Sequence, residues 1–150
     1  MASAIRAPLT PQSVNVCVDM QQLFGAAGLW PAPWIERRRE AIERLAARFP
    51  ERTVFTRFVP PEKADDMPRA WRHFYERWPN GTRAELDPGQ IELFPELAAL
   101  VPPAKVFDKP VYSPFSGTSF PRHLAQRHAD ALIVSGAETD VCVLATILGA

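Results

Sequence analysis

Short apolar runs rich in β-branched and aromatic residues alternate along the chain with segments whose apolar residues have helical spacing. Four runs have the composition of buried strands: VNVCVD (14–19), TVFTRF (53–58), KVFD (105–108) and ALIV (131–134). Helical spacing predicts helices from 33 or 34 to 49, from 65 or 66 to 78, from 95 to 100 and from about 119 to 127. After a lead-in up to about Ser13, this alternation predicts an α/β fold with a parallel sheet.

The last twenty residues, ALIVSGAETDVCVLATILGA, combine a buried strand, a turn and an apolar helix. We expect the helix to begin at Val141, with Thr139 or Asp140 as its N-cap. Cys142 then lies in the first helical turn, at the carboxyl end of a strand, where backbone N–H groups and the helix dipole favour a thiolate. On position alone, a nucleophile and a small buried apolar residue are equally good interpretations of Cys142.

Composition and charge are those of an ordinary globular domain. The chain has 150 residues, 47% of them apolar and 23% charged, and its 17 basic and 17 acidic residues cancel. This balance gives no excess of positive charge that would indicate binding to a nucleic acid or an anionic membrane. No stretch approaches the roughly 18 apolar residues of a membrane span. Two cysteines do not make a disulfide framework, so we expect a reduced, cytoplasmic protein.

Three reactive side chains stand at the carboxyl ends of predicted strands: Asp19, Lys109 and Cys142. In open parallel sheets the ligand site lies outside these ends. A thiol that attacks a carbonyl group needs a base for its proton, a cation beside the charged pair and donors for the oxyanion. Each residue alone has a simpler explanation, because an Asp after a strand is often a turn residue and a Lys before Pro is usually solvated. Together they predict a site for a small-molecule substrate.

Aromatic residues at positions 71, 74, 75 and 78 follow the i, i+3, i+4, i+7 spacing of one helix face. The stripe is core in the simpler interpretation, and part of it walls a substrate pocket in the other. Arg57, at the end of the second strand, also has two interpretations. Its planar fork could pair with a substrate carboxylate, or it could form a surface ion pair.

Four segments resemble motifs of the isochorismatase-like cysteine hydrolases, the superfamily that includes nicotinamidase, N-carbamoylsarcosine amidase and ureidoacrylate hydrolase. In chain order they are VNVCVDMQQLF, FTRF, KPVYSPFSGTSF and SGAETDVCV. The resemblance implies a three-layer α/β/α fold with a mostly parallel sheet. The resemblance implies that Asp19 is the general base, Lys109 its cationic partner and Cys142 the nucleophile. It also implies a cis peptide bond between Ala137 and Glu138 that turns the N–H groups of Glu138 and Cys142 toward the oxyanion.

The resemblance implies hydrolysis of a small amide or ureido carbon–nitrogen bond through a thioester, with no cofactor. Residues expected to contact the substrate are Phe24, Arg57, Trp71, Tyr75 and Phe115. Hydrolysis of a vinyl ether, as in isochorismatase itself, stays open because that chemistry does not require a cysteine. A non-catalytic domain of the same fold also stays open. A nucleotide-binding domain is disfavoured, because the chain has neither G-x-G-x-x-G nor a P-loop lysine.

We expect residues 1–150 to form a single domain that is truncated relative to the family. The family continues past the nucleophile helix with further strand and helix units, whereas this sequence stops inside that helix. The strand at 131–134 would then be an open edge with exposed apolar surface. We therefore expect either a fragment of a longer protein or a chain completed by a partner subunit, as in a homo-oligomer.

The sequence predicts that catalysis is independent of metal. Nicotinamidases carry an Asp-x-His motif after the second strand, whereas this chain has Thr-Arg-Phe-Val-Pro at 56–60. The three histidines, at 73, 123 and 128, lack ligand spacing and are expected on helix surfaces. We expect a chelator such as EDTA to leave turnover unchanged. Stoichiometric zinc or iron in the purified protein, together with activity that chelator removes, would contradict this expectation.

Overall fold

The computed structural model describes residues 8–150, so the first seven residues of the predicted lead-in lie outside the described part. A four-stranded sheet in the order β3-β2-β1-β4 forms the centre of the molecule, and all its strand pairs are parallel. The strands are β1 (Val14–Val18), β2 (Thr53–Phe58), β3 (Lys105–Lys109) and β4 (Leu132–Gly136). The predicted α/β fold with a mostly parallel sheet is confirmed.

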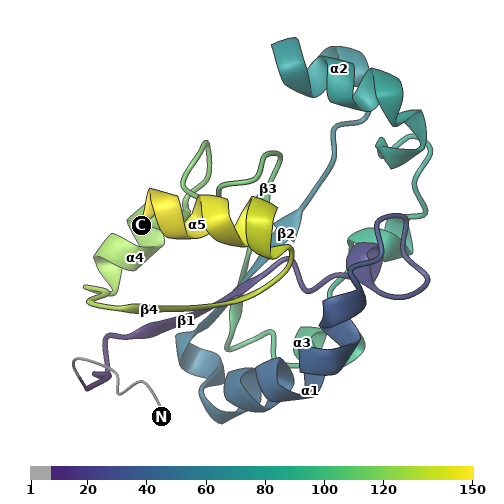
Figure 1. Ribbon diagram of the computed structural model, residues 1–150. Coiled ribbons are helices and arrows are strands. Elements are labelled where there is room, and N and C mark those ends of the chain that lie inside the picture. Colours follow the sequence, from purple (N-terminus) through teal and green to yellow (C-terminus); the bar gives the residue numbers. More distant parts are fainter. Residues whose placement is uncertain (1–7) are drawn as a thin grey trace.

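Helices cover both faces of the sheet. They are α1 (Pro33–Arg48), α2 (Arg69–Arg77), α3 (Pro95–Ala98), α4 (Phe120–Gln126) and α5 (Leu144–Gly149). Figure 1 shows α1 and α3 on one face and α4 and α5 on the other, which makes three layers, while α2 lies beyond the carboxyl ends of the strands. Short 3-10 helices occur at Gln22–Phe24, Pro50–Arg52, Ala64–Asp66, Pro79–Gly81 and Pro88–Ile91. Among the described helices, none is long and apolar enough to cross a membrane.

Two apolar cores follow from the two-residue period of the central strand. Val14, Val16 and Val18 of β1 point to one face, where they pack in the core that includes Phe120 of α4. Cys17 points to the other face and packs in the core that includes Ile35 of α1. Because β1 is buried on both faces, its sequence is almost continuously apolar.

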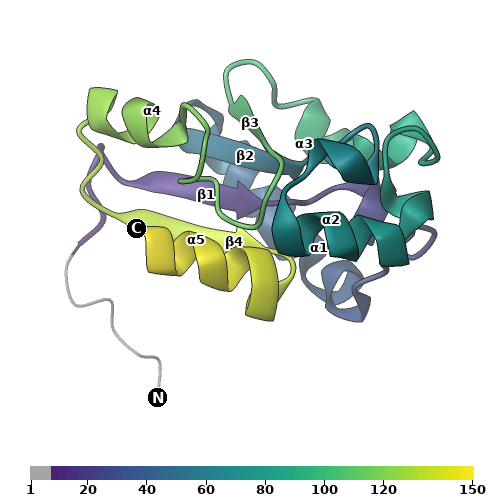
Figure 2. The same cartoon turned by 90° about the horizontal axis from the view of Figure 1, so that it is seen from above.

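The strand order reverses between β1 and β4. The chain adds β2 and β3 successively on one side of β1 and then crosses to place β4 on the other side. The path from β3 to β4 runs through α4, on the opposite face from α1, as the two views in Figures 1 and 2 show. A crevice therefore forms at the carboxyl ends of β1 and β4, which is where open parallel sheets bind ligands.

Element ends differ from the sequence prediction where a proline or a wider turn intervenes. The predicted helix from 65 or 66 to 78 is wrong in its first turn, because Met67 before Pro68 is extended and α2 begins only at Arg69. The predicted start of the last helix at Val141, capped by Thr139 or Asp140, is also wrong. Thr139–Val143 forms a π-helical turn, Glu138 is its N-cap, and no side chain caps it.

Strand β4 lies further along the chain than predicted, because Ser135 and Gly136 continue the ladder opposite Cys17 and Val18 of β1. Only glycine fits at the last of these positions. The φ angle of Gly136 is +115°, and a Cβ atom there would lie 2.0 Å from the Val18 carbonyl oxygen. Gly136 thus allows β1 and β4 to stay paired up to their carboxyl ends.

Replacing Gly136 by alanine should therefore be much more costly than the same change at Gly117. Gly117 also has a positive φ, of +71°, but a Cβ atom there has no neighbour within 4 Å. Gly117→Ala should lower the free energy of unfolding by about 1–2 kcal/mol, the conformational cost alone. Gly136→Ala should lower it by at least about 3 kcal/mol, because a clash with backbone is added. Equal losses for the two variants in urea denaturation would contradict the close approach of β1 and β4.

Candidate active site

The carboxyl ends of three strands bring Asp19, Lys109 and Cys142 into contact. Asp19 directly follows β1, Lys109 ends β3, and Cys142 lies in the π-helical turn after β4. The Lys109 Nζ atom lies 2.7 Å from Oδ2 of Asp19 and 3.4 Å from Sγ of Cys142. All three side chains are buried, with Cys142 only 5% exposed. The structure thus assembles the three residues that the sequence singled out.

Asp19 is held in place by the neighbouring strand β2. The Thr56 hydroxyl donates to Oδ1 of Asp19 at 2.6 Å, and the Asp19 N–H donates to the Thr56 carbonyl oxygen at 3.1 Å. Asp19 has a positive φ of 49°, a conformation that aspartate tolerates better than most residues. Thr56 was not identified from the sequence. The available signal was its position two residues after Val54, which places a polar side chain on the same face of the strand as an apolar one.

Lys109 is fully buried and its ammonium group is surrounded by acceptors. Besides Asp19 and Cys142, it donates to the Val111 carbonyl oxygen at 3.3 Å, and it lies 5.4 Å from the centre of the Phe58 ring. A buried ammonium group without such partners would be strongly destabilising. The alternative interpretation of Lys109 as a solvated side chain is wrong.

The surroundings of the Cys142 sulfur favour the thiol over the thiolate. Burial raises the pKa of Cys142 well above its usual value, and the negative charge of Asp19 raises it further. Lys109 lowers this pKa, but its effect is smaller. Lys109 and the helix start therefore oppose burial and Asp19 at this sulfur, and the expected ranking of the two thiols stays a prediction.

The backbone before Cys142 has an unusual path. The peptide bond between Ala137 and Glu138 is cis. The Glu138 carbonyl oxygen accepts hydrogen bonds from Val141 at 3.2 Å and from Val143 at 3.1 Å, but not from the N–H of Cys142 between them. The wide π-helical turn therefore frees that N–H from the hydrogen bond that an α-helical turn would give it.

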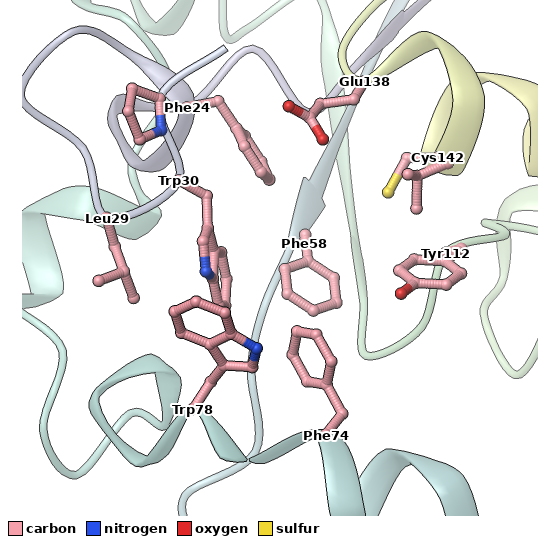
Figure 3. Close-up of a pocket in the computed structure, with 11 residues that line it drawn as sticks. Phe24, Leu29, Trp30, Phe58, Phe74, Trp78, Tyr112, Glu138 and Cys142 are labelled. Carbon is pink, nitrogen blue, oxygen red and sulfur yellow. The ribbon is translucent and has the colours of Figure 1, made fainter.

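A cavity of about 520 Å³ opens beside the Cys142 sulfur, as Figure 3 shows. Its walls are mostly aromatic and apolar, and the lining residues are Phe24, Leu29, Trp30, Pro31, Phe58, Phe74, Trp78, Tyr112, Glu138, Val141 and Cys142. Trp78 is 42% exposed and Tyr112 is 40% exposed, so these two rings lie at the mouth. The size and lining are those of a site for a small organic molecule.

Of the five residues expected to contact a substrate, only Phe24 lines this cavity. Arg57 does not reach it, because its guanidinium group bonds both oxygens of Asp108, at 2.7 and 3.0 Å, and Glu92 at 3.0 Å. Phe115 lies against Phe120 in the core on the α4 side of the sheet. Neither residue lines the cavity, and Arg57 forms the surface ion pair that was its other interpretation.

The aromatic stripe of α2 divides between the two interpretations that the sequence left open. Phe74 and Trp78 line the cavity, whereas Trp71 and Tyr75 pack behind that wall. The Trp71 ring lies 4.6 Å from the Tyr112 ring, and Tyr75 is fully buried. Trp71 and Tyr75 therefore pack behind the cavity wall and do not line it.

The histidines are not arranged as metal ligands. Within residues 8–150, no group of three His, Cys, Asp or Glu side chains is placed to hold a metal ion. His73 is exposed and bonds Glu76. His123 is buried against the Phe107 ring, at 5.2 Å, and its burial lowers its pKa, so the expectation that it lies on a helix surface is wrong.

Comparison with known proteins gives a family and a set of similar structures. The family model of the isochorismatase domain matches residues 13–150. A cysteine hydrolase from Pseudomonas syringae pv. phaseolicola 1448A superposes with a TM-score of 0.79 at 25% identity, over 99% of this chain and 70% of that one. N-carbamoylsarcosine amidase from Thermoplasma acidophilum gives a TM-score of 0.70 at 20% identity, over 91% of this chain and 73% of that one.

The nicotinamidase PncA from Bacillus subtilis has the same fold, with a TM-score of 0.70 at 23% identity over 91% of this chain and 76% of that one. A comparison with curated protein sequences finds no match.

The two thiols should differ in reactivity because only one of them faces the cavity. Burial raises the pKa of Cys17 to about 12, and its side chain is fully enclosed in β1. We expect iodoacetamide to label Cys142 well before Cys17 in the folded protein. Since the Cys142 pKa is also raised, its labelling rate should keep rising between pH 7 and pH 9, by about tenfold per unit while the thiol remains mostly protonated.

Peptide mapping by mass spectrometry measures both rates, and the urea-unfolded protein is the control in which the two thiols become equivalent. Equal labelling in the folded protein, or a Cys142 rate that is already constant at pH 7, would contradict this account.

Proposed function

The chain belongs to the isochorismatase family of hydrolases, and from this premise we propose that it cleaves a carbon–nitrogen bond of a small amide or ureide. The observation that carries the proposal is the position of Lys109 Nζ between Asp19 Oδ2 and Cys142 Sγ, at the end of a mostly apolar cavity. A nucleophile, a carboxylate base and a cation in mutual contact are the groups that thiol-mediated acyl transfer requires.

In the proposed first step, Asp19 takes the proton of the Cys142 thiol and the sulfur attacks the substrate carbonyl carbon. The negative charge moves from the carboxylate to the sulfur and then to the carbonyl oxygen. Lys109 contacts both of the first two positions, so the charge stays beside the same cation during the proton transfer. The N–H groups of Glu138 and Cys142 hold the oxyanion in this proposal.

Collapse of the tetrahedral intermediate breaks the carbon–nitrogen bond. The leaving nitrogen receives the proton from Asp19, and the acyl group stays on Cys142 as a thioester. Asp19, again a carboxylate, then takes a proton from a water molecule that attacks the thioester carbonyl carbon. The acid product leaves, and the thiol is restored with the proton held by Asp19.

Removal of the nucleophile or the base tests this proposal with a panel of small amides and ureides. Cys142→Ala should abolish turnover, because no thioester can form. Asp19→Asn should reduce turnover by about 10²–10⁴-fold, the usual loss for a general base. Cys17→Ala, in the other core, is the control and should keep turnover.

A transient mass increase on Cys142 equal to the acyl group is the direct signature of the thioester. Full turnover by Cys142→Ala would exclude the proposed mechanism. Full turnover of an enol ether by Cys142→Ala would instead support the vinyl ether hydrolysis that the sequence left open.

A further inference from the structure

The cavity beside Cys142 has a mostly aromatic wall. Six of its eleven lining residues are aromatic. Trp30 links this wall together, because its ring centre lies 5.9 Å from that of Phe74 and 6.3 Å from that of Phe58. A continuous aromatic surface offers few hydrogen-bonding partners to a polar ligand, but it can pack against the face of a planar ring.

Among residues 8–150, no unpaired cation lies in this cavity to bind a substrate carboxylate. Within residues 8–150, no lysine or arginine lines it. Lys109, next to the sulfur, already forms a buried ion pair with Asp19, and the Arg57 guanidinium is occupied by Asp108 and Glu92. A carboxylate brought into the cavity would lose its hydration without gaining a partner.

One lining residue, Glu138, carries a carboxyl group. The Glu138 carboxylate is turned into the cavity on the same side as the Cys142 sulfur, as Figure 3 shows, and it forms no ion pair with any described residue. Burial and the nearby Asp140 raise the pKa of Glu138, so the environment already disfavours one negative charge there. A second negative charge on the substrate would be repelled.

We propose that the substrate of this site is an aryl or similarly flat apolar amide without a carboxylate, and that Glu138 is the residue that rejects anionic analogues. The inference rests on the proposed amide hydrolysis and deepens it. It assigns Glu138 a specificity role through its side chain, separate from the proposed role of its backbone N–H.

Alkylation of Cys142 by two reagents of nearly equal size tests the charge preference without requiring a known substrate. Iodoacetamide is neutral and iodoacetate is anionic. We divide each rate constant at Cys142 by the rate constant of the same reagent with a small free thiol, which removes the intrinsic difference in reactivity. The normalised rate should favour iodoacetamide by at least about tenfold at low ionic strength.

Glu138→Gln should reduce this preference to less than about threefold, because the amide keeps the shape of the side chain and removes its charge. Asp140→Asn is the matched control: it removes the same charge two residues away, from a side chain that does not line the cavity, and should keep the preference. Equal normalised rates in the unsubstituted protein, or an unchanged preference in Glu138→Gln, would overturn the role of Glu138.

The apolar part of the proposal is tested with N-benzyl iodoacetamide. Its ring should bind against the aromatic wall and make alkylation of Cys142 about tenfold faster than that by iodoacetamide, after the same normalisation. Trp78→Ala should reduce this gain, whereas Trp34→Ala, an exposed residue outside the cavity, should not. The absence of any gain would overturn the aromatic preference.

Turnover separates this inference from the proposed function. Equal kcat/KM for an aryl amide and its ring-carboxylated analogue would overturn the inference and leave amide hydrolysis standing. Selective labelling of Cys142 without turnover of any amide or ureide would overturn the proposed function, while the charge and ring preferences of the site would stand.

Discussion

The buried ion pair between Asp19 and Lys109 is the interaction on which the site depends. Both side chains are fully enclosed, and they come from β1 and β3, which are separated in the sheet by β2. The intervening strand takes part through Thr56, whose hydroxyl donates to the second oxygen of Asp19. Removing one member of such a pair leaves the other charge buried without a partner, at a typical cost of about 3–5 kcal/mol. The carboxyl ends of three strands are therefore held in one geometry.

The same enclosed environment sets the chemistry of the sulfur. Low local polarity strengthens the attraction between Asp19 and Lys109, and it also raises the pKa of Cys142. These effects are compatible with the proposed mechanism, because transfer of the thiol proton to Asp19 would leave the number of charges beside Lys109 unchanged. In that mechanism the thiolate forms only together with a neutral carboxyl group, which can then protonate the leaving group.

The reversal of strand order explains where the cavity lies. Strand β4 lies on the far side of β1, and the turn after it supplies Glu138 and Cys142 to the cavity wall. The remaining walls come from the connections after β1 and β3, from the end of β2, and from α2 and the residue that follows it. Asp19, Lys109 and Cys142 thus lie at the edge of the sheet, whereas most of the cavity wall comes from the connections between strands.

The sequence alone located the four strands and the three residues that meet at their carboxyl ends, because both follow from local patterns. The run TVFTRF predicted β2 with the bounds that the structure has, and Asp19, Lys109 and Cys142 were identified because parallel strands share one carboxyl edge. The partners of side chains were decided only by the tertiary structure. Arg57 is paired with Asp108 because the register of β2 and β3 places these two residues opposite each other. The aromatic stripe on and just after α2 likewise divides: Phe74 and Trp78 lie at the cavity, and Trp71 and Tyr75 lie behind it. Helical periodicity predicts that one face of a helix is buried, but it does not predict which part of the structure packs against each residue of that face.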